Sequence, residues 1–382
     1  MTIESVPPES PDTPSGHGIA AALGVIDAAG DEAALRAGIG QARQAVTAEL
    51  AAHTPAPALA AGWSEVLRGG VAAAVRLTAI DGAADWSWFV SGSVARGEAA
   101  PGSDVETMVA LSDAVSDERK VALMARAAEV HALLERCGIQ GDGNGVLASR
   151  PRFCRRMASW TEGIERWAAD PREDRGVVMT GLMADAAAVG LADAAVAGLA
   201  DAAVAGLADA AVAGRHPGIA EDVLRAHTVE AARRHYAARQ AMLDDATTLR
   251  AGFPSRLRIF SRHADTVDMK AAMVDPVVKI ARWAGLSAGS VAVSTLGRLD
   301  AAGAANILDA EDVSTLHECF LWLTRFRWRL RAGPWLQGRP VSDVVTLADI
   351  APHERAVLRG VHREVAGISR KLTFLASTSA FR

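Results

Sequence analysis

The sequence predicts an α+β fold, in which helices surround a mixed sheet near the middle of the chain and an all-α region follows. The aromatic and β-branched run Trp86–Val90 is typical of a strand, and Ser91-Gly92-Ser93 directly after it is typical of a turn. Ala-rich segments with apolar residues at helical spacing precede this strand. From residue 215 almost to the end, apolar residues again recur at helical spacing, with breaks at stretches that contain Gly and Pro.

The sequence pattern divides the chain into five parts. Residues 1–18 are rich in Pro, Ser and Glu, which indicates a disordered tail. Residues 19–80 are expected to form N-terminal helices, broken near the HTPAPA stretch, and residues 81–190 the sheet-bearing domain. Residues 191–214 form an inserted octapeptide repeat, and residues 215–382 an all-α domain of about six helices.

Within the sheet-bearing domain, three segments have the composition of strands. They are Trp86–Val90, Glu106–Leu111 and the apolar, partly β-branched run Val177–Met183. A helix is predicted over residues 116–137, between the second and third of these strands.

The repeat ADAAVAGL recurs almost unchanged between Ala184 and Gly214, with an aspartate in each unit. These aspartates are Asp185, Asp193, Asp201 and Asp209. Eight residues rotate a helix by about 80° beyond two turns, so the aspartates would not form a stripe. We interpret the repeat as a low-complexity insertion. An acidic metal-binding array is the less favoured alternative, because the chain would have to fold back to bring these side chains to one ion.

The composition excludes several classes of function. A net charge of −5 and a pI near 6.1 argue against a broad, non-specific nucleic-acid surface, although a local basic cleft stays possible. The three cysteines, Cys137, Cys154 and Cys319, lie far apart and lack the spacing of a zinc or redox pair. No uncharged apolar run approaches the length of about twenty residues that a membrane-spanning helix needs, and the N-terminus lacks the features of a signal peptide. We therefore expect a cytoplasmic protein without membrane or nucleic-acid partners.

One arrangement carries chemistry: a strand, Gly92-Ser93, ten intervening residues, and then Asp104-Val105-Glu106 at the start of the next strand. A glycine after a strand allows close approach of the backbone to a phosphate, and Ser93 adds a hydroxyl and an N–H donor. Because alternate residues of a strand share a face, Asp104 and Glu106 should point the same way. Two carboxylates on one face suit Mg²⁺ ions that bridge the phosphates of a nucleotide.

This combination resembles the signature of the DNA polymerase β-type nucleotidyltransferase superfamily. The stretch GSVARGEAAPGSDVE resembles one bacterial subgroup in particular, which contains the N-terminal domain of protein-PII uridylyltransferase and the nucleotidyltransferases named DUF294. Four further landmarks agree: GNGVLASRPRF at 143–153, Trp160 with Trp167, Asp268-Met-Lys270, and Pro276 with Arg282. The C-terminal half, including STLGRL at 294–299, is similar to the helical substrate-binding domain of that family. The resemblance covers roughly residues 60–375 without the repeat, and it implies a nucleotidyltransferase-fold sheet.

The resemblance also implies roles for individual residues. Gly92 and Ser93 would contact phosphates, Asp104 and Glu106 would bind metal, and Asp185 would be the third carboxylate. Family members usually carry an arginine two positions after that aspartate, whereas this chain has Ala187.

Two basic residues keep alternative roles. Arg96 would either neutralise a triphosphate or shape the loop by pairing with Glu98 or Asp104. Lys270 would either reach a phosphate from the helical domain or be an exposed surface lysine.

The implied activity is Mg²⁺- or Mn²⁺-dependent transfer of UMP or AMP from a nucleoside triphosphate to a protein acceptor. Two alternatives stay open: a small-molecule acceptor, and a catalytically silent nucleotide-binding regulator, which the alanine at position 187 favours. The sequence leaves the oligomeric state open. It lacks the His-Asp phosphohydrolase pattern and the ligand-binding ACT domain of full-length uridylyltransferases, so the short DUF294 architecture fits better.

Overall fold

The computed structural model describes four stretches of the chain, residues 17–78, 85–190, 219–248 and 266–378. The predicted tail, apart from the residues that begin the first helix, and the octapeptide repeat lie outside these stretches. Three N-terminal helices come first: α1 (His17–Asp27), α2 (Glu32–Ala51) and α3 (Ala56–Leu77). The break between α2 and α3 falls at the predicted HTPAPA stretch, where a proline precedes α3 and another lies in its first turn.

The sheet has four strands: β1 (Trp86–Ser91), β2 (Glu106–Leu111), β3 (Cys154–Arg156) and β4 (Ala187–Ala188). Their order is β3-β2-β1-β4, with β1 antiparallel to β2 and β4, and β2 parallel to β3. The prediction of a mixed sheet, and of its first two strands, is therefore confirmed. A single-turn helix, α4 (Gly92–Ala95), follows β1, and α5 (Asp117–Arg136) matches the predicted helix.

The predicted third strand, Val177–Met183, is wrong. These residues lie in helix α7 (Gly176–Ala184), which follows helix α6 (Met157–Ala169). Met179 and Met183 are buried four residues apart, while Val178 directly before Met179 is 55% exposed, as helical spacing requires. Packing against neighbouring helices overrides the β-propensity of this short run. The strand that does pair with β1 on this side is β4, which has only two residues.

The sheet separates two hydrophobic cores, because alternate residues of each strand point to opposite faces. On one face, Trp88 of β1 and Val109 of β2 pack with the N-terminal helices and α5. On the other face, Phe89 and Met108 pack with α6, α7 and the helices that follow the repeat. This double cover explains why every residue of β1 is buried.

The part of the chain after the repeat is helical, as predicted. Its described helices are α9 (Ile219–Arg234), α10 (Tyr236–Thr247), α11 (Asp275–Ser287), α12 (Thr295–Ala304), α13 (Ala310–Leu336) and α14 (Pro352–Ser377). One short antiparallel ladder, β5 (Thr266–Asp268) with β6 (Val344–Thr346), interrupts it. The sequence did not reveal this ladder, because two three-residue segments far apart in the chain carry no measurable alternation.

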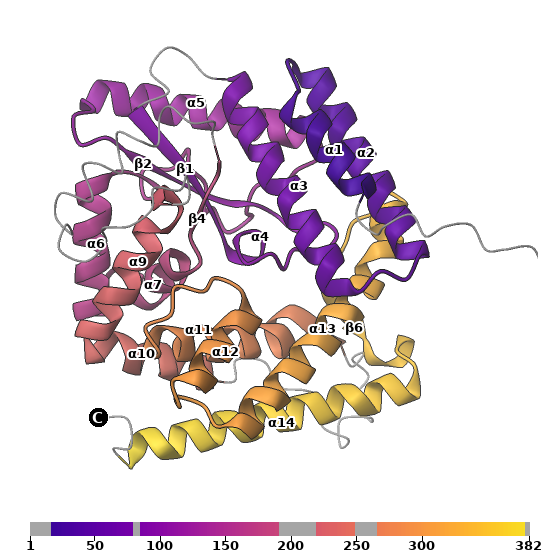
Figure 1. Cartoon of the computed structure of the whole chain (residues 1–382), viewed down its shortest axis with the longest axis vertical. Helices are drawn as coiled ribbons and strands as arrows, with labels where there is room; N and C mark the ends of the chain where they lie inside the picture. The colour runs from indigo at the N-terminus through magenta and orange to yellow at the C-terminus, as the bar shows by residue number, and fades with distance from the viewer. Residues whose placement is uncertain (1–16, 79–84, 191–218, 249–265, 379–382) are drawn as a thin grey trace, which may run out of the picture.

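The helical region lies against the side of the sheet-bearing part where α4 is located. In Figure 1, α11, α12 and α13 lie below the sheet and face α4, while α14 runs along the lower edge. The N-terminal helices also contact this region: Arg43 of α2 donates a hydrogen bond of 2.8 Å to the carbonyl of Trp335, and Trp63 of α3 meets the Trp335 ring edge-on.

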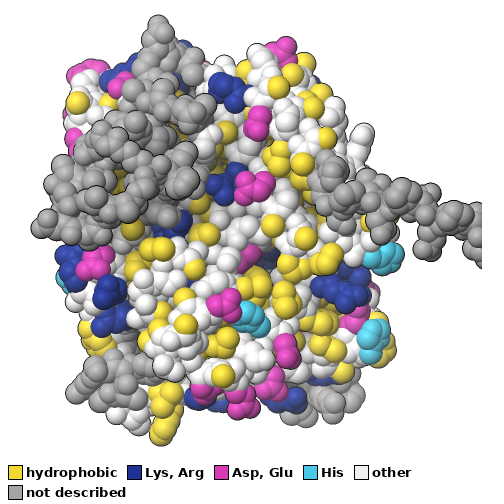
Figure 2. Space-filling view, in the orientation of Figure 1, with side chains coloured by type: hydrophobic (Ala, Val, Ile, Leu, Met, Phe, Trp, Pro, Cys, Tyr) yellow, Lys and Arg dark blue, Asp and Glu magenta, His cyan; other side chains and the backbone are white. Residues whose placement is uncertain are grey.

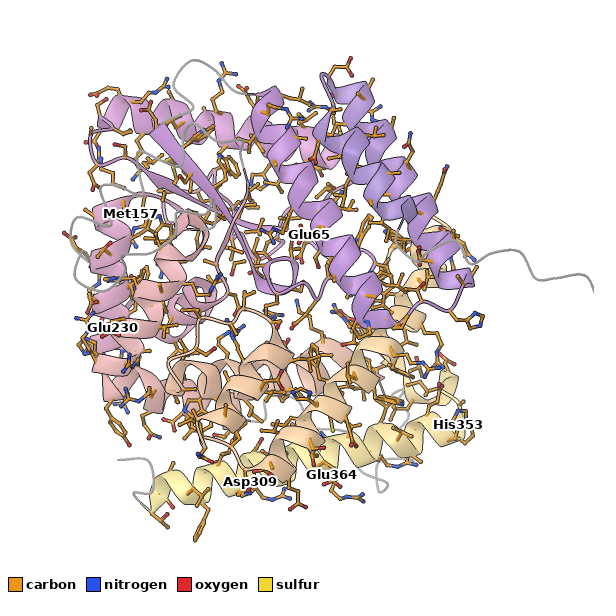
Figure 3. All side chains as sticks on the ribbon, viewed as in Figure 1. Glu65, Met157, Glu230, Asp309, His353 and Glu364 are labelled. Carbon is orange, nitrogen blue, oxygen red and sulfur yellow. The ribbon has the colours of Figure 1, made fainter. Side chains whose placement is uncertain are left out.

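The surface carries charges of both signs. On the face drawn in Figure 2, Lys and Arg side chains are interspersed with Asp and Glu, and no continuous basic area covers this face. Figure 3 labels two acidic residues on the lower side of the molecule, Glu364 of α14 and Asp309 directly before α13. Among the described helices, none combines the length and apolar character that a membrane-crossing segment needs.

A partly buried histidine couples α5 to the sheet. His131 Nε2 lies 2.9 Å from Thr107 Oγ1 on β2. Burial lowers the pKa of His131 to about 4, because no acidic partner compensates for the loss of solvation of the imidazolium. The folded protein therefore favours neutral His131, whereas the unfolded chain binds a proton at its ordinary pKa near 6.5.

We predict that His131 contributes to stability at neutral pH and that this contribution is lost as the pH falls from about 6.5 toward 4. Urea unfolding of the wild type and of His131→Gln should differ by about 1–2 kcal/mol more at pH 7 than at pH 4. His353→Gln, at an exposed position on α14 (Figure 3), is the matched control and should show no such change. A difference between wild type and His131→Gln that is independent of pH would contradict the prediction.

Candidate active site

The site begins directly after β1, at a glycine in the left-handed conformation. Gly92 has a φ of +63°, which disfavours any residue with a side chain. A Cβ atom at this position would also lie 2.6 Å from Oε2 of Glu106. The register of the sheet explains the contact, since Ser91 pairs with Glu106 across β1 and β2. Glycine is therefore required here both by the backbone turn and by the carboxylate that packs against it.

Glu106 is partly exposed as a residue, but its Oε2 atom is buried and its carboxylate is incompletely satisfied. Its Oε2 atom has no hydrogen-bond partner among the described residues. Burial raises the pKa of Glu106 to about 7, and the nearby carboxylates of Asp142 and Asp185 add to this effect. The cations Arg96 and Lys270 act in the opposite direction. A buried acceptor without a partner is costly, so this oxygen has the character of a ligand atom for a cation.

Asp104 lies in the loop that leads into β2. Val105 between the two acidic residues is buried, whereas Asp104 and Glu106 are both partly exposed, as expected when alternate residues share a face. Helix α13 positions this loop: Arg331 donates to the carbonyl of Pro101 over 2.8 Å and to that of Gly102 over 3.1 Å.

The carboxylates of Asp104 and Glu106 are donors of the kind that suits a small hard cation. Mg²⁺ prefers oxygen ligands and is often held by one or two carboxylates together with substrate phosphates. Among the described residues, no group of three His, Cys, Asp or Glu side chains converges on one point. The remaining ligands of a metal at this position would therefore come from the nucleotide and from water.

The structure places Asp185 differently from the sequence prediction. Instead of following a strand, it directly follows α7, and it is 1% exposed. Its carboxylate accepts hydrogen bonds from Arg96, Arg282 and Arg298. Burial alone would raise the pKa of Asp185, but these guanidinium groups outweigh it and hold the pKa well below its usual range. The other three aspartates of the repeat lie outside the described residues.

Arg96 makes the ion pair with Glu98 that the sequence offered as one of its alternatives. Its Nε donates to Glu98 over 2.7 Å, and its Nη1 donates to Asp185, whereas the structure shows no contact with Asp104. Glu98 in turn accepts the backbone N–H of Thr295 over 2.6 Å at the start of α12. The loop after β1 is thus tied directly to the helical region.

A cleft separates the two sides of the site. Ser93, Arg96 and Glu98 line one wall. Lys270 and Thr324 line the opposite wall, which belongs to the helical region. Lys270 is exposed at the start of a π-helical turn and forms no ion pair with any residue that the structure describes. Its ammonium group is therefore available to an anionic ligand in the cleft.

Three residues of the site escaped identification as site residues from the sequence. Asp142 sits in the loop beside β2, where its backbone N–H donates to the carbonyl of Val105. Arg282 and Arg298 lie on helices far from Asp185 in the sequence. The family landmarks pointed to Arg282 and to the STLGRL stretch that contains Arg298, but nothing in the pattern indicated that both would meet Asp185.

We predict that replacing the buried carboxyl of Glu106 stabilises the metal-free protein at alkaline pH. A raised pKa in the folded state means that stability falls as the pH rises from about 4.5 through 7. At pH 8 without divalent metal, Glu106→Gln should unfold in urea with a free energy about 1–2 kcal/mol higher than wild type, and the gain should shrink at pH 4. Glu118→Gln, at an exposed position on α5, should show no such gain. A loss of stability in Glu106→Gln at pH 8 would show that the carboxylate is satisfied in the fold.

Comparison with known proteins identifies both halves of the molecule. The family model described as "Putative nucleotidyltransferase DUF294" matches residues 40–174. A second model, described as "Putative nucleotidyltransferase substrate binding domain", matches residues 234–374. No curated protein matches the chain. The two matches cover most of the described chain, include the β1–β2 site and the helical wall of the cleft, and show that the chain belongs to the DUF294 nucleotidyltransferase family.

Proposed function

We propose that this protein transfers a nucleoside monophosphate from a nucleoside triphosphate to an acceptor hydroxyl and releases pyrophosphate. The observation that carries the proposal is the unpartnered Glu106 oxygen, packed against the left-handed Gly92 at the start of the DUF294 loop. A structural glutamate would have a hydrogen-bond partner at such a buried position. A glutamate that binds a metal together with its nucleotide is expected to lack one in their absence.

The residues in and beside the cleft divide into two kinds of role. Asp104 and Glu106 would hold Mg²⁺ or Mn²⁺, which when bound neutralises charge on the triphosphate. Gly92 forms the left-handed turn that would present the backbone to a phosphate, and Ser93 offers a hydroxyl beside it. Lys270 supplies a cation from the opposite wall.

The transfer step needs an acceptor oxygen aligned with the α-phosphorus. The oxygen–phosphorus bond to the acceptor forms, the bond from the α-phosphorus to the pyrophosphate oxygen breaks, and the acceptor proton is released. This chemistry depends mainly on positioning, which a cleft between two domains can provide. The helical domain, which matches the substrate-binding model, forms the wall where the acceptor would bind. By family resemblance, we propose a protein acceptor and UMP or AMP as the transferred group, with a small-molecule acceptor as the alternative.

A catalytically silent nucleotide-binding protein is the second candidate, and one observation favours it. Ala187 occupies the position where the family usually has an arginine, and it is buried in β4, opposite Val90 of β1. This alternative requires nucleotide binding without release of pyrophosphate.

We predict that Asp104→Ala and Glu106→Ala each lower pyrophosphate release by at least about 100-fold, because each removes a carboxylate ligand of the metal. Circular dichroism should show that both variants stay folded. Glu118→Ala on α5 should retain wild-type turnover. Near-normal turnover in either cleft variant would exclude these residues as metal ligands.

Incubation of the purified protein with each α-labelled nucleoside triphosphate, Mg²⁺ and a cell lysate should transfer label to the acceptor. Label on a protein band supports the proposed acceptor class, and label on a small molecule supports the first alternative. Binding of a nucleoside triphosphate without any label transfer would support the silent protein. The Glu106→Ala variant in the same lysate controls for other transferases.

A further inference from the structure

Asp185 lies at the junction between the sheet-bearing part and the helical region, and its carboxylate is completely surrounded by guanidinium groups. Oδ1 accepts from Arg282 Nε at 3.1 Å and from Arg298 Nη1 at 2.6 Å. Oδ2 accepts from Arg282 Nη2 at 2.6 Å and from Arg96 Nη1. Asp185 and Arg298 are almost fully buried, so water does not compete for these bonds.

This arrangement leaves little capacity for a metal ion. A carboxylate offers about four lone-pair directions, and four N–H donors already occupy the two oxygens of Asp185. Three positive guanidinium groups at hydrogen-bond distance would also repel a divalent cation. The disagreement with the third-carboxylate role implied by the family resemblance is therefore chemical as well as geometric.

The partners of Asp185 come from both sides of the cleft. Arg96 follows α4 in the loop after β1, whereas Arg282 belongs to α11 and Arg298 to α12. Arg298 also donates to the carbonyl of Ala184 over 2.6 Å, beside Asp185. The Glu98 contact with the first turn of α12 forms a second link a few residues away.

We infer that Asp185 is a positioning residue that clamps the helical domain against the phosphate-binding loop, and that it is not a ligand of the metal. The geometry alone supports the clamp, while its effect on turnover rests on the proposed function. By fixing α11 and α12 relative to the loop, the clamp sets the separation between Ser93 and Lys270 on opposite walls. Loss of the clamp is expected to impair binding of the acceptor by the helical wall, while the metal and nucleotide keep their ligands on the sheet side.

Two variants distinguish a clamp role of Asp185 from a metal-ligand role, because one changes the net charge of the cluster and the other restores it. Asp185→Asn removes one negative charge and leaves an excess of positive charge in the arginine cluster, whose member Arg96 acts on Glu106, so either role predicts weaker metal binding. Asp185→Asn combined with Arg282→Met restores the net charge of the cluster but supplies no carboxylate. Only the clamp predicts that this second change restores metal affinity.

The measurement is Mn²⁺ binding in the presence of a non-hydrolysable nucleoside triphosphate analogue, followed by electron paramagnetic resonance. We expect Asp185→Asn to bind Mn²⁺ about tenfold more weakly than wild type, and the double variant to return to within about threefold. A double variant as defective as Asp185→Asn would overturn the inference. Glu129→Gln with Arg126→Met, which removes an exposed ion pair within α5, is the matched control and should leave Mn²⁺ binding unchanged.

Hydrogen–deuterium exchange tests the clamp without any metal or turnover. Asp185→Asn and the double variant should both exchange faster in α11 and at the start of α12, and wild-type exchange there in both variants would overturn the clamp.

If Asp185→Asn does not fold, Arg282→Gln replaces it, because Arg282 is partly exposed and its loss keeps Asp185. Arg282→Gln should exchange faster in α11 with Mn²⁺ affinity within about threefold of wild type, whereas a large gain in affinity would indicate a released metal ligand. Wild-type protein that binds neither Mn²⁺ nor nucleotide would contradict the proposed function, and the exchange data would still decide the clamp.

Discussion

The ion pairs around Asp185 hold the two halves of this molecule together at the place where its chemistry is expected. Placing a carboxylate and three guanidinium groups in a buried junction carries a large desolvation cost, which only well-formed hydrogen bonds offset. The bidentate contact with Arg282 and the buried contacts with Arg298 meet that requirement. Loss of one partner of such a buried pair typically costs about 3–5 kcal/mol, so the cluster strongly favours one relative placement of the two domains.

A second constraint sits a short distance away, at the contact between Gly92 and Glu106. Position 92 must be glycine, because its backbone is left-handed and any side chain there would occupy the space of the Glu106 carboxylate. The result is a buried Oε2 atom with no hydrogen-bond partner in the described part of the chain, in a carboxyl group whose pKa is raised to about 7. Keeping such a group costs stability in the free protein, a cost that is characteristic of functional sites.

The two constraints use acidic residues in opposite ways. Glu106 keeps an oxygen without a hydrogen-bond partner, while Asp185 offers both oxygens to arginines. Arg96 pairs with Glu98, and Glu98 accepts a hydrogen bond from the start of α12, so these two residues connect the loop to the helical region. The cleft therefore lies beside the unpartnered carboxylate at the start of β2 and beside an ionic junction that joins its two walls.

The local pattern of the sequence determined much of this protein. The aromatic run before Gly92, the alternation around Val105 and the helical spacing at both ends are short-range signals, and the mixed fold, the first two strands and most helices follow from them. The family resemblance of the loop was also readable, because its residues are contiguous in the chain. Only the tertiary structure decided that Val177–Met183 forms a helix, that two-residue and three-residue strands complete the sheet, and that Arg282 and Arg298 surround Asp185. These outcomes depend on contacts between residues distant in the sequence, where burial, desolvation and charge pairing outweigh local propensity.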